Sequence, residues 1–255
     1  MGSQDNVTAD LSYERSAGFP ALRVAGVDEV GRGCLAGPVV ACAVILPEAW
    51  DVRYSALKKL HPWIERVRDS KMLDPEERDE LFPLIQAAVA GFAIGQASPA
   101  EIDEINILQA TFLAMRRALA GLAQPAQKVL VDGNWAIPQV TVPCQPIIKG
   151  DQHSLSIACA SILAKVTRDR LMVAMDLELP GYGFGSHKGY PTPEHLEGLD
   201  KLGVSAHHRR SFAPVRERLP EAERLALEAA RAAPDEAQPE LFGEVQVPAF
   251  DSSDV

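Results

Sequence analysis

The sequence predicts an α/β fold, built on a mixed five-stranded sheet flanked by helices on both faces. Three apolar segments rich in Val, Ala and Ile lie within the first hundred residues, and the first two are too close together for a crossover helix between them. Beyond residue 98, apolar segments alternate with long stretches of helical periodicity. Three antiparallel strands followed by such an alternation give a mixed sheet, and 255 residues suffice to bury its core.

The three leading strands are expected over residues 22–27, 39–46 and 91–97, each an apolar run containing β-branched residues or bounded by glycine and proline. The connection between the first two is too short for a crossover helix, so they are predicted to pair antiparallel. Residues 48–68 carry two tryptophans and mixed charge, and we expect an irregular excursion there that is longer than usual.

Two helices are expected to begin at capping boxes, over residues 74–77 and 98–101. Pro83 is expected to kink or shorten the first of them. In the second, apolar residues recur at steps of three and four over residues 102–119, and Gly121 marks its end.

The remaining elements are two short strands and one long helix. The strands are expected at residues 128–131 and 147–148, and the helix over about 154–179. Small residues along that helix allow it to pack closely on the sheet; they are Ala158, Ala160, Ser161 and Ala164. The order of all these elements completes the five-stranded sheet, and no internal repeat is visible.

Two acids and a glycine-rich turn close the first strand, in the sequence VDEVGRG at 27–33. Asp28 and Glu29 lie where the strand should end, and glycines on both sides of Arg32 allow close approach of a ligand to the backbone. Successive strand residues point to opposite faces, so both acids reach one site only if the strand twists there or Glu29 offers its carbonyl. An isolated Asp-Glu pair is more often a solvated turn, so this site needs partners elsewhere in the chain.

Asp132 and Asp151 are such partners, because each follows a short apolar segment and lies beside a glycine. Sites in α/β sheets assemble at the carboxyl ends of strands. Clustered carboxylates repel one another unless a cation neutralises them, and oxygen ligands without His or Cys favour Mg²⁺ or Mn²⁺. A pair of such ions suits phosphodiester hydrolysis.

Six motifs, in this order, resemble those of the bacterial ribonuclease HII family over about residues 22–215. They are VDEVGRG at 27–33, VDGN at 131–134, KGDQ at 149–152, ASILAKVTRDRLM at 160–172, HKGYPT at 187–192 and HHRRSFAPV at 207–215. The resemblance implies a ribonuclease H-like fold and metal-dependent endonucleolytic cleavage 5′ of a ribonucleotide, leaving 3′-hydroxyl and 5′-phosphate ends. The implied substrates are RNA–DNA hybrids and single ribonucleotides embedded in duplex DNA, as in ribonucleotide excision repair.

The resemblance also implies roles for individual residues. The catalytic acids, which would hold two Mg²⁺ or Mn²⁺ ions, are by position Asp28, Glu29, Asp132 and Asp151. Backbone groups of Gly31, Arg32 and Gly33 would contact the ribose 2′-hydroxyl, which distinguishes RNA from DNA at one nucleotide. The ring of Tyr190 would pack on the deoxyribose that follows the ribonucleotide.

Basic residues near these motifs are candidate phosphate contacts. Those within motifs of the family are Lys71, Lys149 and Lys188, and those outside this set are Lys165, Arg209 and Arg210. The glycine-rich stretch 181–189 lacks the ending of a phosphate loop, and we interpret it as a flexible connection that presents Tyr190. For the histidines at 187, 207 and 208, packing, capping or phosphate contact is favoured over metal binding, because no acid or Cys is close in sequence.

Three alternatives were weighed against ribonuclease HII. Ribonuclease HIII carries an N-terminal substrate-binding domain and usually Lys at the position of Arg32, and neither fits this sequence. Other nucleases or integrases of the ribonuclease H fold are disfavoured by the Tyr190 motif. A catalytically silent nucleic-acid-binding module is disfavoured by acids at all four positions, and a cleavage assay separates the two classes.

Composition sets the domain plan and the expected location. The net charge is −10, of which −6 falls in residues 216–255, so a positive groove can exist on the main body. We expect a flexible N-terminus at 1–20, a catalytic domain with a helical C-terminal part at 21–219, and an acidic, largely flexible tail at 220–255. The N-terminus lacks the apolar region of a secretory signal, no run is long enough to span a bilayer, and the four cysteines lack metal spacing. These features predict a cytoplasmic protein with reduced cysteines.

The tail combines a solvated helix, expected at 221–233, with a proline-containing acidic linker. Within the linker, QPELF at 238–242 resembles the short peptide through which bacterial repair proteins bind the sliding clamp. Gln238, Leu241 and Phe242 are its candidate partner-binding residues. Five residues with three fixed positions also arise by chance, so the sequence leaves a purely solubilising tail open.

Overall fold

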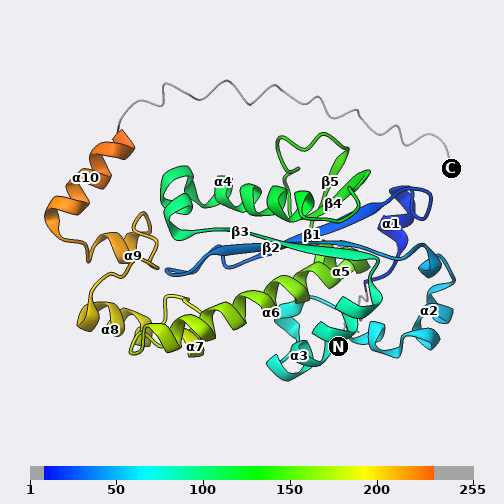
Figure 1. The fold of residues 1–255 in the computed structure, drawn as a ribbon, viewed down its shortest axis with the longest axis horizontal. Coiled ribbons are helices and arrows are strands. Elements are labelled where there is room, and N and C mark those ends of the chain that lie inside the picture. Colours follow the sequence, from blue (N-terminus) through cyan, green and yellow to red (C-terminus); the bar gives the residue numbers. More distant parts are fainter. Residues whose placement is uncertain (1–8, 233–255) are drawn as a thin grey trace, which may run out of the picture. The chain divides into compact units, whose positions relative to one another are not determined.

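The structure is a computed structural model that describes residues 9–232. Its centre is a five-stranded sheet of order β3-β2-β1-β4-β5, which confirms the predicted fold class (Figure 1). The strands are β1 Val24–Val30, β2 Val39–Ile45, β3 Gly91–Ala97, β4 Lys128–Asp132 and β5 Cys144–Ile147. The first three pair antiparallel, as predicted, whereas β1, β4 and β5 run parallel.

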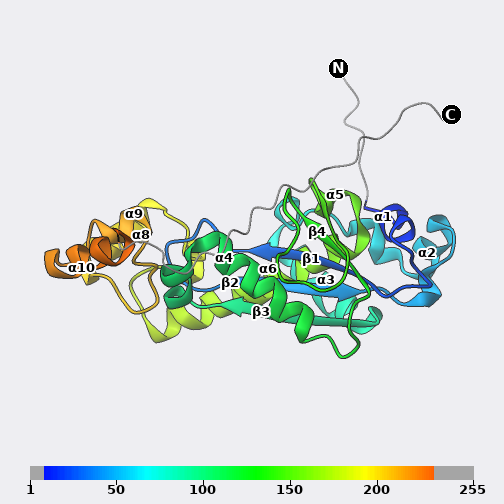
Figure 2. The same cartoon turned by 90° about the horizontal axis from the view of Figure 1, so that it is seen from above.

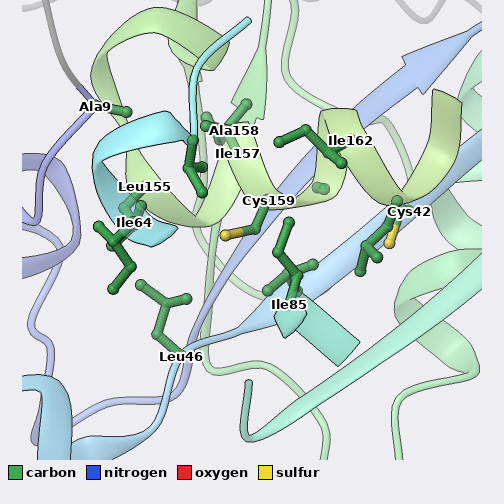
Figure 3. Close-up of a cluster of buried hydrophobic side chains, with 14 of the residues drawn as sticks. Ala9, Cys42, Leu46, Ile64, Ile85, Leu155, Ile157, Ala158, Cys159 and Ile162 are labelled. Atoms are coloured by element: carbon green, nitrogen blue, oxygen red, sulfur yellow. The ribbon is translucent and has the colours of Figure 1, made fainter. Parts of the chain in front are cut away.

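Helices cover both faces of the sheet. Helix α4, Pro99–Ala120, lies along one face, and α6, Leu155–Glu178, lies along the other with α3, Pro75–Ala88, packed beside it (Figures 1 and 2). Each layer encloses its own apolar cluster, and Figure 3 shows the one beneath α6, where Cys42 of β2 and Cys159 of α6 are both buried. The expected buried, reduced cysteines are present here, although Cys144 is only half-buried.

Close approach of helix and sheet depends on small residues. A Cβ added at Gly95 of β3 would lie 2.1 Å from the carbonyl oxygen of Ala114 in α4, so a side chain there would force the helix away. Gly26 of β1 meets α6 in the same way, because its added Cβ would lie 2.3 Å from the Ser156 hydroxyl. Gly91, in the same strand as Gly95, has no atom within 4 Å of an added Cβ.

Both predicted capping boxes are present, with Asp74 and Ser98 as the N-cap residues. Pro83 lies inside α3, yet the helix continues to Ala88, so the predicted shortening is wrong. Asn106 interrupts the helical geometry of α4 with φ 65° and ψ 165°. Its side chain accepts the N–H groups of the second and third residues after it, which restarts the helix as an internal cap.

Two predictions of irregular or flexible chain are wrong. Residues 9–20, expected to be flexible, form α1, Ser12–Ser16, and bury Leu11 and Phe19 against the body. The excursion at 48–68 consists of short helices. They are η1 Glu48–Trp50, α2 Tyr54–Leu60 and η2 Pro62–Arg66. Their apolar residues are too few for a visible helical period, and burial against distant segments orders them instead.

The glycine-rich stretch at 181–189 is also ordered rather than flexible. It forms α7, Phe184–His187, whose Phe184 is completely buried in a third apolar cluster with Leu35 and Leu199. The short helices after it are α8 Pro193–Leu202 and α9 Ala213–Arg216.

The chain divides into two units, Met1–Leu219 and Pro220–Val255. Of the second unit the structure describes the predicted helix, α10 Glu221–Ala232. The candidate clamp-binding residues Gln238, Leu241 and Phe242 lie outside the described residues. No helix within residues 9–232 is long and apolar enough to cross a membrane.

Candidate active site

Three neighbouring strands bring three of the predicted acids to one edge of the sheet. In the parallel ladder Val27 of β1 pairs with Val131 of β4, so Asp28 and Asp132 are the next residues on adjacent strands. Asp151 lies four residues beyond β5, in the single-turn helix α5, Gly150–His153. The Gly150 amide donates to the Asp132 carboxylate at 2.7 Å, which joins the ends of β4 and β5.

Asp28 and Glu29 point to opposite faces of β1, as the alternation of a strand requires. Asp28 is 5% exposed and faces α6, where the Ser161 hydroxyl hydrogen-bonds its carboxylate. Glu29 faces α4 and lines a cavity of about 100 Å³, which Asp132 also lines. Its carboxylate lies 3.3 Å from the Arg32 guanidinium. Asp132 therefore lies between the two acids, within reach of the charge of each.

Burial and repulsion from neighbouring carboxylates raise the pKa values of Asp28, Glu29 and Asp151. Burial raises the pKa of Asp28 well above its usual range, and the charges of Glu29 and Asp132 add to the effect. The pKa of Glu29 is raised by burial, against the opposing charge of Arg32. Burial and the nearby Asp132 charge raise the pKa of Asp151 to about 6. Positive charge brought to this edge of the sheet would stabilise all of the ionised forms.

A fifth acid that the motifs did not single out belongs to the same cluster. Asp69 is 8% exposed, and its carboxyl group hydrogen-bonds that of Asp151. It also accepts the Lys71 amide at 2.9 Å and caps the short helix η3, Ser70–Met72. The sequence offered one indication of this role, because Asp69 lies two residues before Lys71, which is itself a predicted site residue.

Lys71 is the cation that faces this acidic edge. Burial lowers the pKa of Lys71, but the negative charges nearby raise it by more, so its pKa lies above the usual value for lysine. These charges belong to Asp69, Asp28, Asp151 and Asp132. Its turn is held in place by Arg78, whose guanidinium donates to the carbonyls on either side of it.

The chemistry of these acids fits a hard divalent cation, because every donor is a carboxylate oxygen. Within residues 9–232, no three His, Cys, Asp or Glu side chains are already grouped closely enough to hold one metal ion. Asp28 accepts the Glu29 amide at 2.7 Å, Asp132 accepts the Gly150 amide, and Glu29 pairs with Arg32. Convergence on a shared ion would therefore require side-chain rotation, chiefly of Glu29, while the backbone positions already bring the acids to one edge.

The glycine-arginine-glycine turn lies beside the acids and is held from beneath. Gly31 has φ 92°, and a Cβ there would lie 2.1 Å from the Arg168 guanidinium. The buried Arg209 donates to the Gly31 carbonyl at 2.7 Å and to the Arg32 carbonyl at 2.9 Å. Arg209 is thus not a phosphate contact as proposed from its position, since its guanidinium is committed to this turn. An added Cβ at Gly33 would meet no atom within 4 Å, so the outer side of the turn is open.

The segment that carries Lys188 and Tyr190 is tied to the same turn. The buried Arg168 donates to the Lys188 carbonyl at 2.9 Å, and the Leu35 amide donates to the Gly189 carbonyl at 2.7 Å. Tyr190 is 41% exposed. The Lys188 ammonium folds back onto a backbone carbonyl three residues earlier. It also lines a cavity of about 490 Å³ between α3 and α6, away from the acids.

Two other predicted basic residues differ in their surroundings. Lys149 is exposed and adopts the left-handed conformation, with φ 55°, directly before Asp151's helix. Lys165, in contrast, is paired with Asp169 one turn along α6 at 2.7 Å. Lys149 is therefore available to a ligand, whereas Lys165 is engaged within the protein.

Buried histidines support the backbone around Tyr190. His195 Nδ1 lies 2.9 Å from the Tyr190 carbonyl, which can only accept, so this nitrogen carries the proton. Its other nitrogen must then accept from His208 Nε2 at 3.1 Å. His208 Nδ1 in turn accepts from the amide and the hydroxyl of Ser205. This chain of bonds requires both rings to be neutral, which confirms packing rather than metal binding for His208.

The same conclusion follows from the titration of these rings. Burial lowers the pKa of His208 to about 3, with further lowering by the charges that His195 and His207 carry when protonated. Burial likewise lowers the pKa of His195. A proton on either ring would remove a hydrogen bond on which the Tyr190 segment rests.

The family model described as Ribonuclease HII matches residues 25–215, which include every acid of the site. The chain belongs to the ribonuclease HII family. It is therefore a ribonuclease H, an endonuclease that hydrolyses phosphodiester bonds.

Individual relatives within the ribonuclease HII family agree over most of the chain. Ribonuclease HII of Geobacillus kaustophilus is 48% identical over 216 residues, covering 84% of this chain and 78% of that protein. Ribonuclease HII of Rhodospirillum rubrum is 52% identical over 211 residues, covering 82% of this chain and 91% of that protein.

Solved structures show the same fold. Ribonuclease H2 from Pyrococcus horikoshii matches with a TM-score of 0.62 and 27% identity, and the match covers 83% of this chain and 100% of that one. Ribonuclease HII in a PCNA complex from Archaeoglobus fulgidus matches with a TM-score of 0.55 and 25% identity, covering 75% of this chain and 96% of that one.

The histidine chain predicts a pH dependence of stability. Unfolded His208 titrates near 6.5, whereas the folded value is about 3. The unfolded state therefore binds the proton first, so the stability that neutral His208 contributes is complete above about pH 6.5 and is lost as the pH falls toward 3. H208N keeps an acceptor for Ser205 but does not titrate. We expect its free energy of unfolding, measured by urea denaturation, to fall less steeply than wild type between pH 6.5 and 4. Parallel curves would contradict the assignment of neutral His208.

Proposed function

We propose that this ribonuclease H cleaves the RNA strand of RNA–DNA hybrids and also duplex DNA that contains a single ribonucleotide. The observation that carries the proposal is the position of the acids beside an open glycine-arginine-glycine turn and the half-exposed ring of Tyr190. The acids and the glycine-arginine-glycine turn follow one another in the chain, and hydrogen bonds tie the segment after this turn to the one that carries Tyr190. Groups for hydrolysis, a backbone element for the 2′-hydroxyl and an aromatic surface for a sugar are thus neighbours. The cut would fall 5′ of the ribonucleotide and leave 3′-hydroxyl and 5′-phosphate ends.

The catalytic group in this proposal consists of Asp28, Glu29, Asp132 and Asp151, which would hold two Mg²⁺ or Mn²⁺ ions. Such ions, when bound, make water more acidic and neutralise charge on the scissile phosphate. The chain's own contribution is to hold the carboxylates at adjacent strand ends. Ser161 orients Asp28, and the Gly150 amide orients Asp132. Lys71 keeps its charge and supplies a fixed positive group next to the phosphate path.

Recognition of the ribonucleotide is assigned to the turn at 31–33. Arg209 occupies the carbonyls of this turn, so their side of the backbone faces inward and the opposite side faces the solvent. Lys149 would contact a phosphate of the substrate, and Lys188 would do so only by releasing the backbone carbonyl onto which its ammonium folds. These contacts carry no sequence information, as expected of an enzyme that must act wherever a ribonucleotide occurs.

The first test is removal of charge from the acidic cluster by D132N. The amide oxygen can still accept the Gly150 N–H, so we expect the fold to be retained. Loss of a group that merely orients a metal ligand lowers metal affinity or activity by about 10–100-fold, so loss of a ligand should lower cleavage by at least about 100-fold. The assay is cleavage of a duplex with one ribonucleotide in excess Mg²⁺, with the cut position mapped. D200N on α8 is the matched control, and D132N activity within a few-fold of wild type would exclude Asp132 as a ligand.

The second test concerns Tyr190. An aromatic ring packs more closely on a sugar that lacks a 2′-hydroxyl. Loss of a stacking ring costs about 1–3 kcal/mol of binding free energy. We expect Y190A to reduce cleavage at a lone ribonucleotide in DNA by about tenfold or more. Cleavage within an all-RNA strand should fall less, and Y190F should retain both activities. Equal losses of Y190A on the two substrates would mean that the ring serves only general binding or packing.

A second proposal concerns the partner. We propose that QPELF at 238–242 binds the bacterial sliding clamp and that the enzyme acts in the cytoplasm. The archaeal ribonuclease HII at 25% identity was solved with PCNA, which supports the idea that members of this family attach to a clamp. Tethering would raise the local concentration of the nuclease on newly made DNA.

The test uses a peptide of residues 235–243 and the full chain. We expect the peptide to bind the purified clamp weakly, and substitution of Leu241 and Phe242 by Ala in the full chain to abolish clamp binding. Cleavage of free duplex should be unchanged, and E240A, at a variable position of the motif, should bind normally. Equal clamp affinity of the wild-type and doubly substituted chains, measured by surface plasmon resonance, would exclude the motif as the anchor.

A further inference from the structure

We propose that residues 9–20 form a strap, hereafter the N-terminal strap, whose Glu14 positions Asp151 for metal binding. The proposal deepens the proposed function, since it assumes that Asp151 is a metal ligand. Glu14 itself touches neither the acids nor the substrate turn, and it is a positioning residue rather than a catalytic one. Neither the motifs nor the family match, which begins at residue 25, includes it.

Glu14 is a completely buried acid bound to the junction between α5 and α6. Its Oε1 accepts from the Ser154 hydroxyl at 2.6 Å, the Ser156 hydroxyl at 2.7 Å and the Ser156 amide at 2.8 Å. These donors begin three residues after Asp151. One carboxylate oxygen thus gathers three donors at the first turn of the helix that covers the sheet, where no water competes for them.

A second contact joins the strap to the same junction through the backbone. The Asp10 amide donates to the His153 carbonyl at 3.2 Å, and the Leu155 amide donates to the Asp10 carbonyl at 2.9 Å. Asp10 and Ser154 therefore form an isolated parallel bridge. The Tyr13 ring also contacts the His153 ring, with 6.3 Å between centroids.

These contacts determine the position of Asp151 because α5 is only one turn long. At its start, the Gly150 amide is held by Asp132. At its end, His153 and Ser154 are held by the strap, and the Ser154 amide closes the turn on the Gly150 carbonyl at 2.8 Å. Asp151 lies between two fixed points, and removal of the second leaves the far end of its helix without the contacts that the strap provides.

The strap is in turn anchored by the excursion at 48–68. The Tyr54 hydroxyl donates to the Ala9 carbonyl at 2.7 Å. Arg15 pairs with Asp51 at 3.0 Å and donates to the Val52 carbonyl at 2.6 Å. Ala9 itself enters the apolar cluster beneath α6, next to Leu155 (Figure 3). Figures 1 and 2 both show α1 and α2 at the same end of the sheet. Through these contacts the excursion at 48–68 holds the strap against the α5–α6 junction.

The test compares E14A with E14Q in the full-length chain. E14A leaves three donors without their acceptor, whereas the E14Q amide oxygen can still accept them. Loss of a group that orients a metal ligand typically weakens metal binding by about 10–100-fold. We expect E14A to raise the Kd for Mn²⁺, measured by isothermal titration calorimetry, by about tenfold. E14Q should stay within about threefold, and the Mn²⁺ concentration for half-maximal cleavage should shift in parallel.

A matched control separates positioning from general destabilisation. L199A removes a buried side chain of α8 from the third apolar cluster, which contains none of the acids, and leaves a cavity there. It should lower the unfolding temperature but leave the Kd for Mn²⁺ unchanged. If E14A is destabilised like L199A and binds Mn²⁺ with wild-type affinity, the strap is only structural and the proposal is wrong.

Two further arms keep the outcome decisive. Should E14A not fold, S156A removes one of the three donors and is expected to weaken Mn²⁺ binding by a few-fold. Unchanged affinity in S156A would overturn the proposal.

The wild-type chain tests the proposed function independently. Absence of cleavage by wild type would refute that function, whereas the effect of Glu14 on Mn²⁺ affinity is measured without any substrate.

Discussion

The parallel register between β1 and β4 determines where the charges of this enzyme lie. Val27 pairs with Val131, so the acids that follow them are neighbours at the carboxyl ends of adjacent strands. A slip of one residue would turn Asp132 to the opposite face and separate it from Asp28. On its other edge β1 pairs antiparallel with β2, so of its two immediate neighbours only β4 has its carboxyl end beside that of β1. The single switch from antiparallel to parallel pairing therefore creates the acidic edge, as switch points do in other α/β sheets.

Concentrating carboxylates at one edge opposes folding, and the surrounding structure offsets this cost locally. Arg32 pairs with Glu29, Lys71 faces the remaining acids, and backbone amides bond Asp28 and Asp132. Two further guanidiniums, those of Arg168 and Arg209, are fully buried and donate to backbone carbonyls. Each bonds several carbonyls, and together they fix the segments 31–38 and 188–190 in place at the cost of burying charge. Most cationic side chains near this site therefore bond other groups of the protein, and fewer of them remain available to bind a ligand.

The regular elements were predictable because each depends on local pattern. The capping boxes at Asp74 and Ser98, the periodicity of α4 and the first four strands appear at or within three residues of the predicted positions. The fifth strand, expected at 147–148, instead runs over Cys144–Ile147 and overlaps the expected segment at one residue. The errors share a different cause. Residues 9–20, the excursion at 48–68 and the stretch at 181–189 become ordered only through distant partners, such as Tyr54 for Ala9. Arg209 was misjudged for the same reason, since charge in the sequence does not reveal that its acceptors are carbonyls more than 170 residues away. Asp69 lies two residues before Lys71 in the sequence, but only the folded structure shows that it contacts Asp151.

The positions of the four predicted acids therefore depend on elements of two kinds. Asp28, Glu29 and Asp132 are set by strands whose register is fixed by buried apolar residues on both faces. Asp151 does not lie on a strand, because the segment after β5 is one helical turn, held at its start by Asp132 and at its end by Glu14 and Asp10 from outside the sheet. Such a residue needs long-range hydrogen bonds to reach the geometry that strands give the others, since a shift of about 1 Å is costly in catalysis. Glu14 and Asp10 provide these bonds from a segment that lies before the first family motif. The length of chain needed for an accurate active site is consequently greater than the length that carries recognisable chemistry.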